Sequence, residues 1–300
     1  MTKAAVAMFS LKNVFPKDPV GTLRKVASLG YYGVELFNHA EDSCPGIYAF
    51  RDLCVNMTTK EYKKIMDDLG LVTVGYQPVC KDPNDASWLA SIDTQKRLID
   101  FCVEVGSESV ALVCELFRST EFILKRCEMY NKFGELCNEA GIDLVYHNHW
   151  TDFIQFDGKN AFDMVLENTE SHLVKLEIDV YWTLLGMEDP VKMIRKYGSR
   201  VAMAHEKDFP LAAIDELNVW KTYDRNTPID FETFHKYKQP HHFCEIGEGI
   251  IKVQDVINAL NEVGGRYLIV EQDFTQLDEI ESIKVSANNF RKMYGITLRQ

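Results

Sequence analysis

A regular alternation of short β-branched runs with helix-period stretches is the feature that most constrains the fold of this chain. Strands separated by helices pair in parallel, because each helical crossover returns the chain to the same edge. The expected strands are Ala4–Phe9, Gly33–Phe37, Val72–Gln77, Ser109–Cys114, Asp143–His149, Val174–Trp182, Val201–Asp208 and Arg266–Asp273. The expected helices are Pro19–Leu29, Thr59–Leu69, Ser87–Val105, Glu121–Ala140, Ala161–Glu170, Pro190–Tyr197 and Val253–Val263.

Cap residues mark the ends of these helices. Asp18 and Asp189 each precede a proline, and Thr58 stands three residues before Glu61, as in a capping box. Glycine follows several of the helices, where its left-handed conformation ends a helix without a Cβ penalty. These glycines are Gly30, Gly70, Gly106, Gly141 and Gly264.

Eight parallel strands with short right-handed crossovers favour closure into a (β/α)8 TIM barrel. The alternative, a doubly wound open sheet, usually carries a G-x-G-x-x-G or P-loop motif, and neither occurs. A barrel of about 250 residues accounts for most of the 300. No low-complexity linker divides the chain, so we expect an α/β fold with a single domain over residues 1–300. The longest irregular stretch, about 209–250, is long enough to be functional.

Composition and charge exclude several classes of protein. The net charge of −12 argues against nucleic-acid binding, because excess carboxylates repel a phosphate backbone. No apolar run is long enough for a membrane span, and no signal peptide is recognisable, so a cytoplasmic protein is expected. The eight cysteines form no C-x-x-C pair and are expected to be reduced, mostly buried thiols.

Polar side chains gather at the ends of the last four expected strands. In a barrel, catalytic groups lie at these carboxyl ends. Because strand side chains alternate between faces, one face of these strands presents four polar residues at similar depth. They are His147, Asp179, His205 and Glu271. The next residues on that face, expected one step nearer the mouth, are His149, Tyr181, Lys207 and Asp273.

Two imidazoles and two carboxylates that converge from neighbouring strands predict a metal site. Burying these charges without a metal would carry a large desolvation cost. A ligand set without thiolates suits several divalent ions and does not choose among them. We take Mn²⁺ as the first choice, with Co²⁺, Zn²⁺, Fe²⁺ or Mg²⁺ as alternatives.

An ordered set of motifs resembles the sugar phosphate isomerase/epimerase superfamily, which has a xylose isomerase-like TIM barrel. Its members include tagatose-type epimerases, hydroxypyruvate isomerase, inosose dehydratase and, more distantly, endonuclease IV. The motifs lie in the expected order and extend over nearly the whole chain. They are Tyr31–Leu36, Tyr146–His149, Asp179–Trp182, His205–Asp208, Gly247–Gly249 and Val270–Asp273.

The resemblance implies a metal site built from Glu, Asp, His and Glu on strands five to eight. Asp179, His205 and Glu271 match the last three. On strand five, His147 stands where many members carry Glu, as in a subgroup with Tyr-His-Asn-His. His147 is the first choice for the fourth ligand and His149 the second. One of the two is then ligand and the other base, so the epimerases' mechanism with two glutamates does not carry over directly.

The implied chemistry is proton abstraction next to the carbonyl of a ketose, keto-polyol or related sugar, with a metal-stabilised enediolate. Glu271, His147 or His149 would remove the proton, and Lys207 would hold the oxyanion. Epimerisation, isomerisation, dehydration and lyase elimination all proceed from this intermediate, and the sequence does not separate them. The residues expected to contact the substrate are Trp182, Tyr181, Glu35, Asp273 and Trp150.

Two other functions compete with this interpretation. An endonuclease IV-like nuclease needs further ligands on the early strands and a basic rim, and the sequence shows neither. A non-catalytic sugar-binding subunit would bind metal without turnover. The expected partner is a small sugar or polyol, with no nucleic acid and no membrane, and association into a homo-oligomer stays open.

Overall fold

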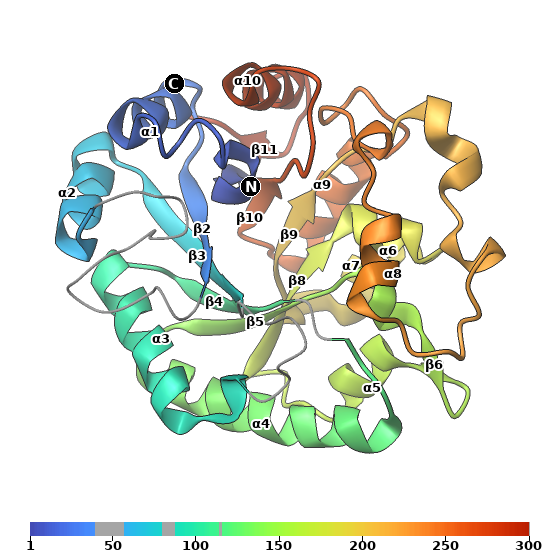
Figure 1. Ribbon diagram of the computed structural model, residues 1–300. Coiled ribbons are helices and arrows are strands. Elements are labelled where there is room, and N and C mark those ends of the chain that lie inside the picture. The colour runs from blue at the N-terminus through green and yellow to red at the C-terminus, as the bar shows by residue number, and fades with distance from the viewer. Residues whose placement is uncertain (40–56, 80–87, 114–115, 300) are drawn as a thin grey trace.

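Eight parallel strands close into a barrel, and helices surround it (Figure 1). The computed structural model describes residues 1–39, 57–79, 88–113 and 116–299. The strands follow one another in chain order, and the barrel closes where β10 pairs in parallel with β1. This confirms the predicted TIM barrel. Its strands are β1 (Thr2–Ala7), β2 (Gly33–His39), β3 (Val72–Val79), β4 (Ser109–Leu112), β5 (Asp143–His147), β8 (Val174–Asp179), β9 (Val201–Glu206) and β10 (Tyr267–Val270).

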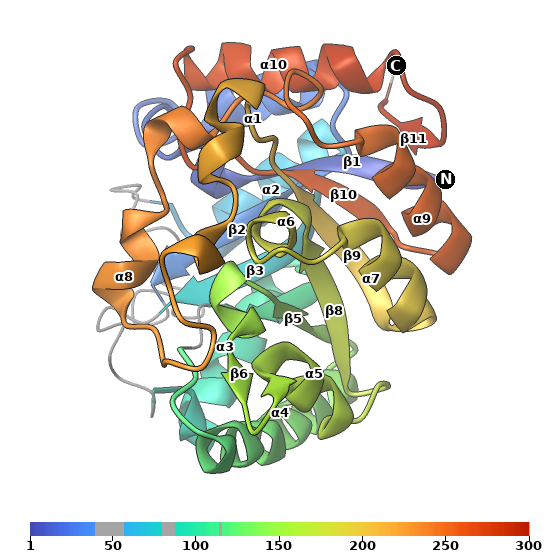
Figure 2. The ribbon, with the colours of Figure 1, turned by 90° about the vertical axis from the view of Figure 1, so that its right-hand side faces the viewer.

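The described helices lie on the outside of the barrel and over its carboxyl-terminal end (Figures 1 and 2). Short strands complete the chain: β6 (Gln155–Phe156) and β7 (Lys159–Asn160) form a hairpin, and β11 (Ile296–Thr297) pairs with the start of β1. The α-helices are α1 (Pro19–Ser28), α2 (Thr59–Leu69), α3 (Ile92–Val105), α4 (Thr120–Glu139), α5 (Ala161–Glu167), α6 (Val180–Leu185), α7 (Pro190–Tyr197), α8 (Phe231–Lys236), α9 (Val253–Val263) and α10 (Glu279–Phe290).

The predicted caps are present. Asp18 accepts a hydrogen bond from the Gly21 amide at the start of α1. Thr58 and Glu61 form the reciprocal capping box at the start of α2, and Gly70 ends that helix with φ of +65°. The bounds of α2, α7 and α9 therefore agree with the sequence prediction.

Three of the described α-helices were not expected: α6, α10 and α8, which lies in the stretch 209–250 that was expected to be irregular. The predicted strand Val174–Trp182 ends at Asp179, because the Asp179 carboxylate accepts a hydrogen bond from the Trp182 amide at 2.7 Å and caps α6. The sequence prediction also lacked α10. Asp278 caps this helix, with acidic residues in its first turn, and Ile283, Ala287 and Phe290 are on its buried face.

Small and apolar side chains fill the barrel interior. Ala5, Ala7, Val145, Met203 and Ile269 belong to this inner cluster, whereas their neighbours along the strands pack against the helices. Because strand side chains alternate, a residue two places after an interior one also points inward. The inner apolar cluster thus sits directly beneath His147, His205 and Glu271, each two residues beyond one of its members.

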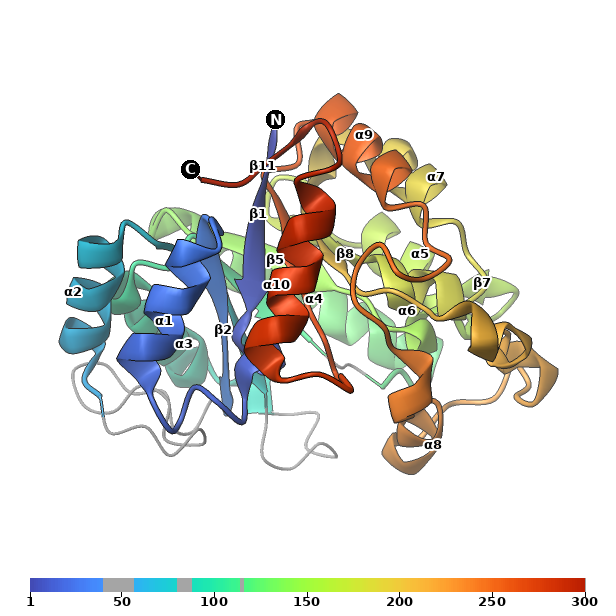
Figure 3. The ribbon, with the colours of Figure 1, turned by 90° about the horizontal axis from the view of Figure 1, so that it is seen from above.

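The segment 209–250 joins β9 to α9, and we call it the β9–α9 loop. It contains three 3₁₀ helices, Leu211–Glu216, Val219–Lys221 and Pro240–His242, together with α8. Figures 2 and 3 show α8 at the end of the barrel opposite the two chain termini. Since β1 begins at the N-terminus, this is the end where the barrel strands finish, and it is the end that carries the predicted site.

The described cysteines agree with the expectation of reduced thiols. Cys102, Cys127 and Cys137 are buried and Cys244 is half-buried, and all four are free. Cys44, Cys54, Cys80 and Cys114 lie outside the described residues. Among the described helices, none combines the length and apolarity that crossing a bilayer requires.

Candidate metal centre

Four polar residues from four neighbouring strands converge at the carboxyl-terminal end of the barrel. His147 lies on β5, Asp179 on β8, His205 on β9 and Glu271 immediately after β10. One ligand atom of each lies within 4.8 Å of the corresponding atoms of the other three, and all four residues are buried. The structure therefore brings together the four residues that the sequence placed at one depth.

His147 is oriented by the carboxylate of Glu177. Its Nδ1 lies 3.1 Å from Glu177 Oε2, and its Nε2 lies 3.8 Å from Asp179 Oδ2. A carboxylate on one ring nitrogen fixes the tautomer and turns the other nitrogen toward the centre. Glu177, on β8, has this orienting position.

His205 lies among three carboxylates. Its Nε2 is 2.7 Å from Glu35 Oε2 and 3.4 Å from Glu177 Oε1, and its Nδ1 is 2.8 Å from Glu271 Oε2. Burial alone would lower the pKa of His205, but the three carboxylates outweigh burial and hold the pKa well above its ordinary value.

Lys207 lies deeper than its sequence position suggested. Its ammonium group contacts Asp179 Oδ2 and Glu271 Oε2, so it shares the layer of the four converging residues. Asp273 Oδ2 is 3.9 Å away. Burial lowers the pKa of Lys207, but Asp179 and Glu271 outweigh it and raise the pKa above its ordinary value. The group is therefore a buried cation between two candidate ligands.

The sequence predicted that Tyr181 and Trp182 continue the strand. This was wrong, because both residues lie in α6. The Trp182 ring faces the Lys207 ammonium at 5.4 Å and the His149 ring at 5.5 Å. Tyr181 stacks instead on Phe243 of the β9–α9 loop, with ring centroids 4.8 Å apart. The helix turn moves Tyr181 off the inward-facing row because α6 begins directly after Asp179.

His149 lies beside His147, with ring centroids 5.0 Å apart. The Phe234 ring of α8 covers it at 5.3 Å, and its pKa is well below the ordinary value because of burial and of the nearby charges of His147 and Lys207. Trp150 is farther back: it is fully buried and packs on Phe234 with the ring planes stacked. The rings of His149, Trp150, Trp182 and Phe234 contact one another in this way, and we call them the aromatic wall over the centre.

Glu35 and Asp273 contact charged side chains at the centre. Glu35 is 1% exposed, and its Oε2 accepts a hydrogen bond from Gln77 Nε2 at 2.9 Å besides its contact with His205. Asp273 Oδ1 contacts the ammonium group of Lys238, which comes from the β9–α9 loop. Asp273 thus lies between lysines from two parts of the chain.

Asp208 is a structural residue whose role sequence reasoning missed. Its carboxylate accepts hydrogen bonds from the backbone amides of Phe209, Gly247, Gly249 and Ile251, at 2.8 to 3.0 Å. A Cβ atom on Gly249 would lie 2.2 Å from Asp208 Oδ1. The Gly-Glu-Gly motif is therefore needed for the close approach of this backbone, which anchors the returning end of the β9–α9 loop beside Lys207. The sequence signal that could have revealed this role was the presence of both motifs, His205–Asp208 and Gly247–Gly249, in one chain.

A divalent metal fits the donor set of the centre. Five buried carboxyl groups surround it, on Glu35, Glu177, Asp179, Glu271 and Asp273. In the described part of the chain, the ammonium groups of Lys207 and Lys238 contact three of them, and Lys12 donates a hydrogen bond to the backbone carbonyl of Asp273. Burial and the neighbouring Glu177 raise the pKa of Glu35, which shows that negative charge is crowded here, and a bound cation would relieve this crowding. The donors, imidazole and carboxylate, are those that Mn²⁺, Zn²⁺ and Fe²⁺ accept.

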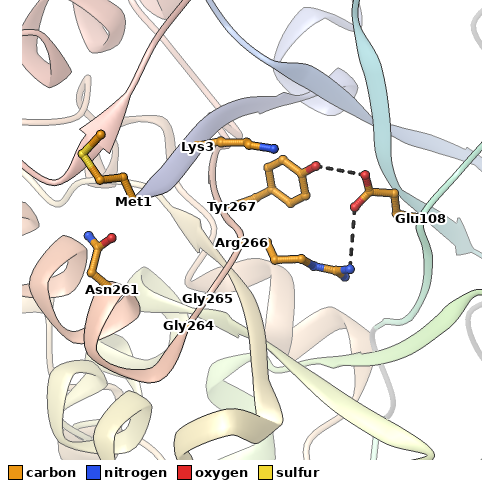
Figure 4. Close-up of a pocket in the computed structure, with 8 residues that line it drawn as sticks. All are labelled: Met1, Lys3, Glu108, Asn261, Gly264, Gly265, Arg266 and Tyr267. Carbon is orange, nitrogen blue, oxygen red and sulfur yellow. Dashed lines mark hydrogen bonds and ion pairs between the residues drawn. The ribbon is translucent and has the colours of Figure 1, made fainter.

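A cavity of about 450 Å³ lies at the opposite, amino-terminal end of the barrel (Figure 4). Tyr267 donates a hydrogen bond to Glu108 at 3.0 Å, and Arg266 pairs with the same carboxylate at 3.7 Å. Catalytic residues of TIM barrels lie at the other end, so this cavity is separate from the candidate centre.

Comparisons with known proteins agree with this fold. The family described as xylose isomerase-like TIM barrel matches residues 23–293. The inosose dehydratase of Geobacillus kaustophilus is 25% identical over 210 residues, which are 69% of this chain and 59% of that protein. The inosose dehydratase of Clostridium perfringens (strain 13) is 27% identical over 147 residues, which are 49% of this chain and 46% of that protein. The chain thus spans about half of the length of these curated relatives.

Solved structures share the fold over almost the whole chain. A sugar phosphate isomerase/epimerase from Parabacteroides distasonis has a TM-score of 0.76 at 22% identity, and 99% of this chain and 96% of that chain are covered. An IOLI protein crystallised with a binding zinc atom has a TM-score of 0.66 at 14% identity, with 97% of each chain covered.

Proposed function

This chain belongs to the xylose isomerase-like TIM barrel family, and from that premise we propose that it is a divalent-metal-dependent isomerase or epimerase. Its substrate is a ketose, keto-polyol or related sugar, from which it removes a proton next to a carbonyl. The observation that carries this proposal is the convergence of His147, Asp179, His205 and Glu271, whose ligand atoms lie within 4.8 Å of one another. The name of the Parabacteroides distasonis protein, a sugar phosphate isomerase/epimerase, supports it.

The four converging residues would hold the metal, with Mn²⁺ as our first choice. A bound divalent ion supplies Lewis-acid chemistry: it polarises a carbonyl and favours negative charge on its oxygen. His147 is the strand-five ligand in this proposal, because its Nε2 faces Asp179 while Glu177 holds its Nδ1.

His149 and Glu271 are the candidate bases. His149 is held against His147 by Trp182 and Phe234, and its lowered pKa keeps the imidazole neutral at pH 7, as a base requires. Lys207 carries a positive charge beside both carboxylate ligands, where it can donate a hydrogen bond to an oxygen that gains negative charge.

Trp182 is the member of the aromatic wall that we propose to contact the substrate, because its ring faces both Lys207 and His149. We propose that the other four residues expected to bind substrate act mainly by holding this constellation. Tyr181 packs on Phe243, Trp150 supports Phe234 in the aromatic wall, Glu35 holds His205, and Asp273 holds the lysines.

Solvent deuterium exchange tests the proposal. The Mn²⁺-loaded protein is incubated in D₂O with a panel of ketoses, inososes and 3-keto-glycosides, and products are followed by NMR and mass spectrometry. We expect deuterium at a carbon next to the carbonyl of at least one compound. Asp179→Asn should abolish both metal binding and exchange, whereas Asp163→Asn, on the outer helix α5, should retain both. A metal-loaded protein that exchanges no deuterium across the panel would favour a binding role.

Two strand-five variants separate ligand from base. His147→Gln should lose bound Mn²⁺, whereas His149→Gln should retain it and lose exchange by about 10²- to 10⁴-fold, the usual contribution of a general base. The reverse pattern would assign the ligand to His149.

Dehydration is the second candidate function, favoured by the inosose dehydratase relatives. The same proton abstraction followed by loss of a β-hydroxyl gives a product one water molecule lighter than the substrate. Mass spectrometry of the inosose samples distinguishes this product from an isomer of unchanged mass, and loss of a glycosyl group from the 3-keto-glycosides would reveal a lyase.

A further inference from the structure

A second group of metal-ligating side chains lies in the β9–α9 loop, outside the candidate centre of the barrel. Glu216 ends the 3₁₀ helix Leu211–Glu216, and His241 and His242 belong to the 3₁₀ helix Pro240–His242. Their ligand atoms lie within 4.8 Å of one another. Glu216 contacts His241 and His242, which are 25 and 26 positions later in the chain, and both contacts are between side chains.

The imidazole of His242 has an oxygen atom at each of its nitrogens. Its Nδ1 lies 3.1 Å from the carbonyl oxygen of Tyr237, and its Nε2 lies 3.0 Å from Glu216 Oε2. The ring is buried and stacks on Phe209. A neutral imidazole carries one proton, so a hydrogen bond to the carbonyl leaves a lone pair on Nε2, directed at the carboxylate. That arrangement is repulsive unless a cation or a second proton neutralises it.

The same arrangement is usual in metal sites. A histidine ligand generally donates its other ring N–H to a carbonyl or carboxylate, which fixes the tautomer and directs the free nitrogen to the metal. His241 Nε2 lies 3.2 Å from both oxygens of Glu216, so the carboxylate faces two imidazole nitrogens. Ligands about 2.0–2.1 Å from a tetrahedral zinc ion are about 3.3 Å apart, close to these separations.

We propose that Glu216, His241 and His242 form a second metal site, which binds Zn²⁺ or a similar borderline transition-metal ion. Imidazole ligands disfavour Mg²⁺ and Ca²⁺. The side chains of Glu216 and His241 are 55% and 58% exposed, so water completes the coordination on the solvent side. The site shares no ligand with the barrel centre, and the proposed reaction needs no chemistry from it.

The metal would tie the two ends of a long chain segment together. Between Glu216 and His241 the loop carries α8, with Phe234 against His149, and Lys238 against Asp273 (orange in Figure 1). Tethering both ends of this segment restricts its movement, and so holds the aromatic wall over the barrel centre. The role of the second metal is therefore structural.

Zinc binding by the whole protein tests the site. Wild type, Glu216→Gln, His241→Asn and His172→Asn are dialysed against micromolar buffered Zn²⁺, and bound zinc is counted by mass spectrometry. The two cluster variants alter exposed side chains and should fold normally. His172, an exposed histidine just before β8, is the matched control for adventitious imidazole binding. We expect Glu216→Gln and His241→Asn to bind about one zinc ion fewer than wild type, and His172→Asn to bind as many as wild type.

Amide hydrogen exchange supplies a second measurement, which reports on the chain around Glu216, His241 and His242 rather than on metal bound at the barrel centre. Zn²⁺ should slow exchange at residues 211–216 and 237–243 by at least tenfold in wild type and leave it unchanged in Glu216→Gln. Equal zinc content in wild type and Glu216→Gln would overturn the proposal, as would equal zinc loss in His172→Asn. Exchange that zinc does not alter in wild type would show an ordinary histidine–carboxylate ion pair and would also overturn it.

Discussion

Replacing Lys207 by methionine should separate the two cations that compete for the barrel centre. The Lys207 ammonium contacts Asp179 Oδ2 and Glu271 Oε2, both candidate ligand oxygens, and its side chain is 1% exposed. Without metal, this single positive charge offsets only part of the charge of the two carboxylates. A divalent ion on the same oxygens must either displace it or bind beside it. Methionine has a similar length and no charge, so the variant removes the competing cation with little change in volume.

The metal-free variant should be less stable than wild type. Removing one partner of a buried ion pair costs about 3–5 kcal/mol, because the remaining charge has no compensation. For a large domain, 1 kcal/mol corresponds to about 2–4 °C in Tm, so the melting temperature should fall by about 6–20 °C.

Metal affinity should change in the opposite direction. A unit charge about 4 Å from a dication is repelled by about 8 kcal/mol at an effective dielectric constant near 20. The ammonium can move toward Asp273, whose Oδ2 lies 3.9 Å away, so we take a quarter of that value. The resulting 2 kcal/mol corresponds to roughly 30-fold tighter binding.

Calorimetric titration with Mn²⁺ measures the affinity, and melting with and without metal measures the stability. Lys238→Met is the matched control, because Lys238 pairs with Asp273 and lies in the β9–α9 loop. It should change Mn²⁺ affinity much less. Weaker or unchanged Mn²⁺ binding by Lys207→Met, or an unchanged melting temperature of the metal-free variant, would refute the competition between the two cations.

Three further predictions concern stability. Asp208→Ala should lower the free energy of unfolding in urea by about 3 kcal/mol or more, because it removes the acceptor of several backbone amides; a loss below 1 kcal/mol would contradict the anchoring role. Gly249→Ala should cost about 1–3 kcal/mol in the same assay, since its Cβ would lie 2.2 Å from Asp208 Oδ1, and an unchanged midpoint would show that the loop simply shifts. Burial raises the pKa of Asp163, but hydrogen bonds from Tyr197 and Lys196 outweigh it and lower the pKa below its ordinary 3.8. This carboxylate therefore contributes stability above about pH 4 that is lost as the pH falls through its lowered pKa, so Asp163→Asn should be less stable than wild type at pH 7 and equally stable near pH 2; a difference independent of pH would exclude the linkage.

The barrel could be predicted because its signals are local. Period-two and helix-period patterns, glycines after helices and capping residues each depend on a few neighbouring residues. The alternation of faces along a strand also aligned His147, Asp179, His205 and Glu271 before any coordinates were considered. Four residues at equivalent positions of consecutive strands must meet once the sheet closes.

Local sequence patterns did not predict where β8 ends and α6 begins, because a side-chain hydrogen bond sets that boundary. The apolar and aromatic run through Tyr181 and Trp182 suits a strand as well as a helix. The Asp179 carboxylate decided between them by capping α6, and this moved both aromatic residues off the inward-facing row. The position of Lys207 also changed, because its long side chain reaches back to the ligand layer rather than toward the mouth.

The alternating elements, the inward row of polar residues and the unusual histidine of strand five follow from residue type and spacing, so they could be read from the sequence. Which charges meet depends on the folded chain. It placed Lys207 between Asp179 and Glu271, the Asp208 carboxylate under the glycine motif, and Glu216 beside His241 and His242. Such contacts join residues 25 to more than 60 positions apart, and they depend on strand register, side-chain length and the path of the β9–α9 loop, none of which has a periodic signature.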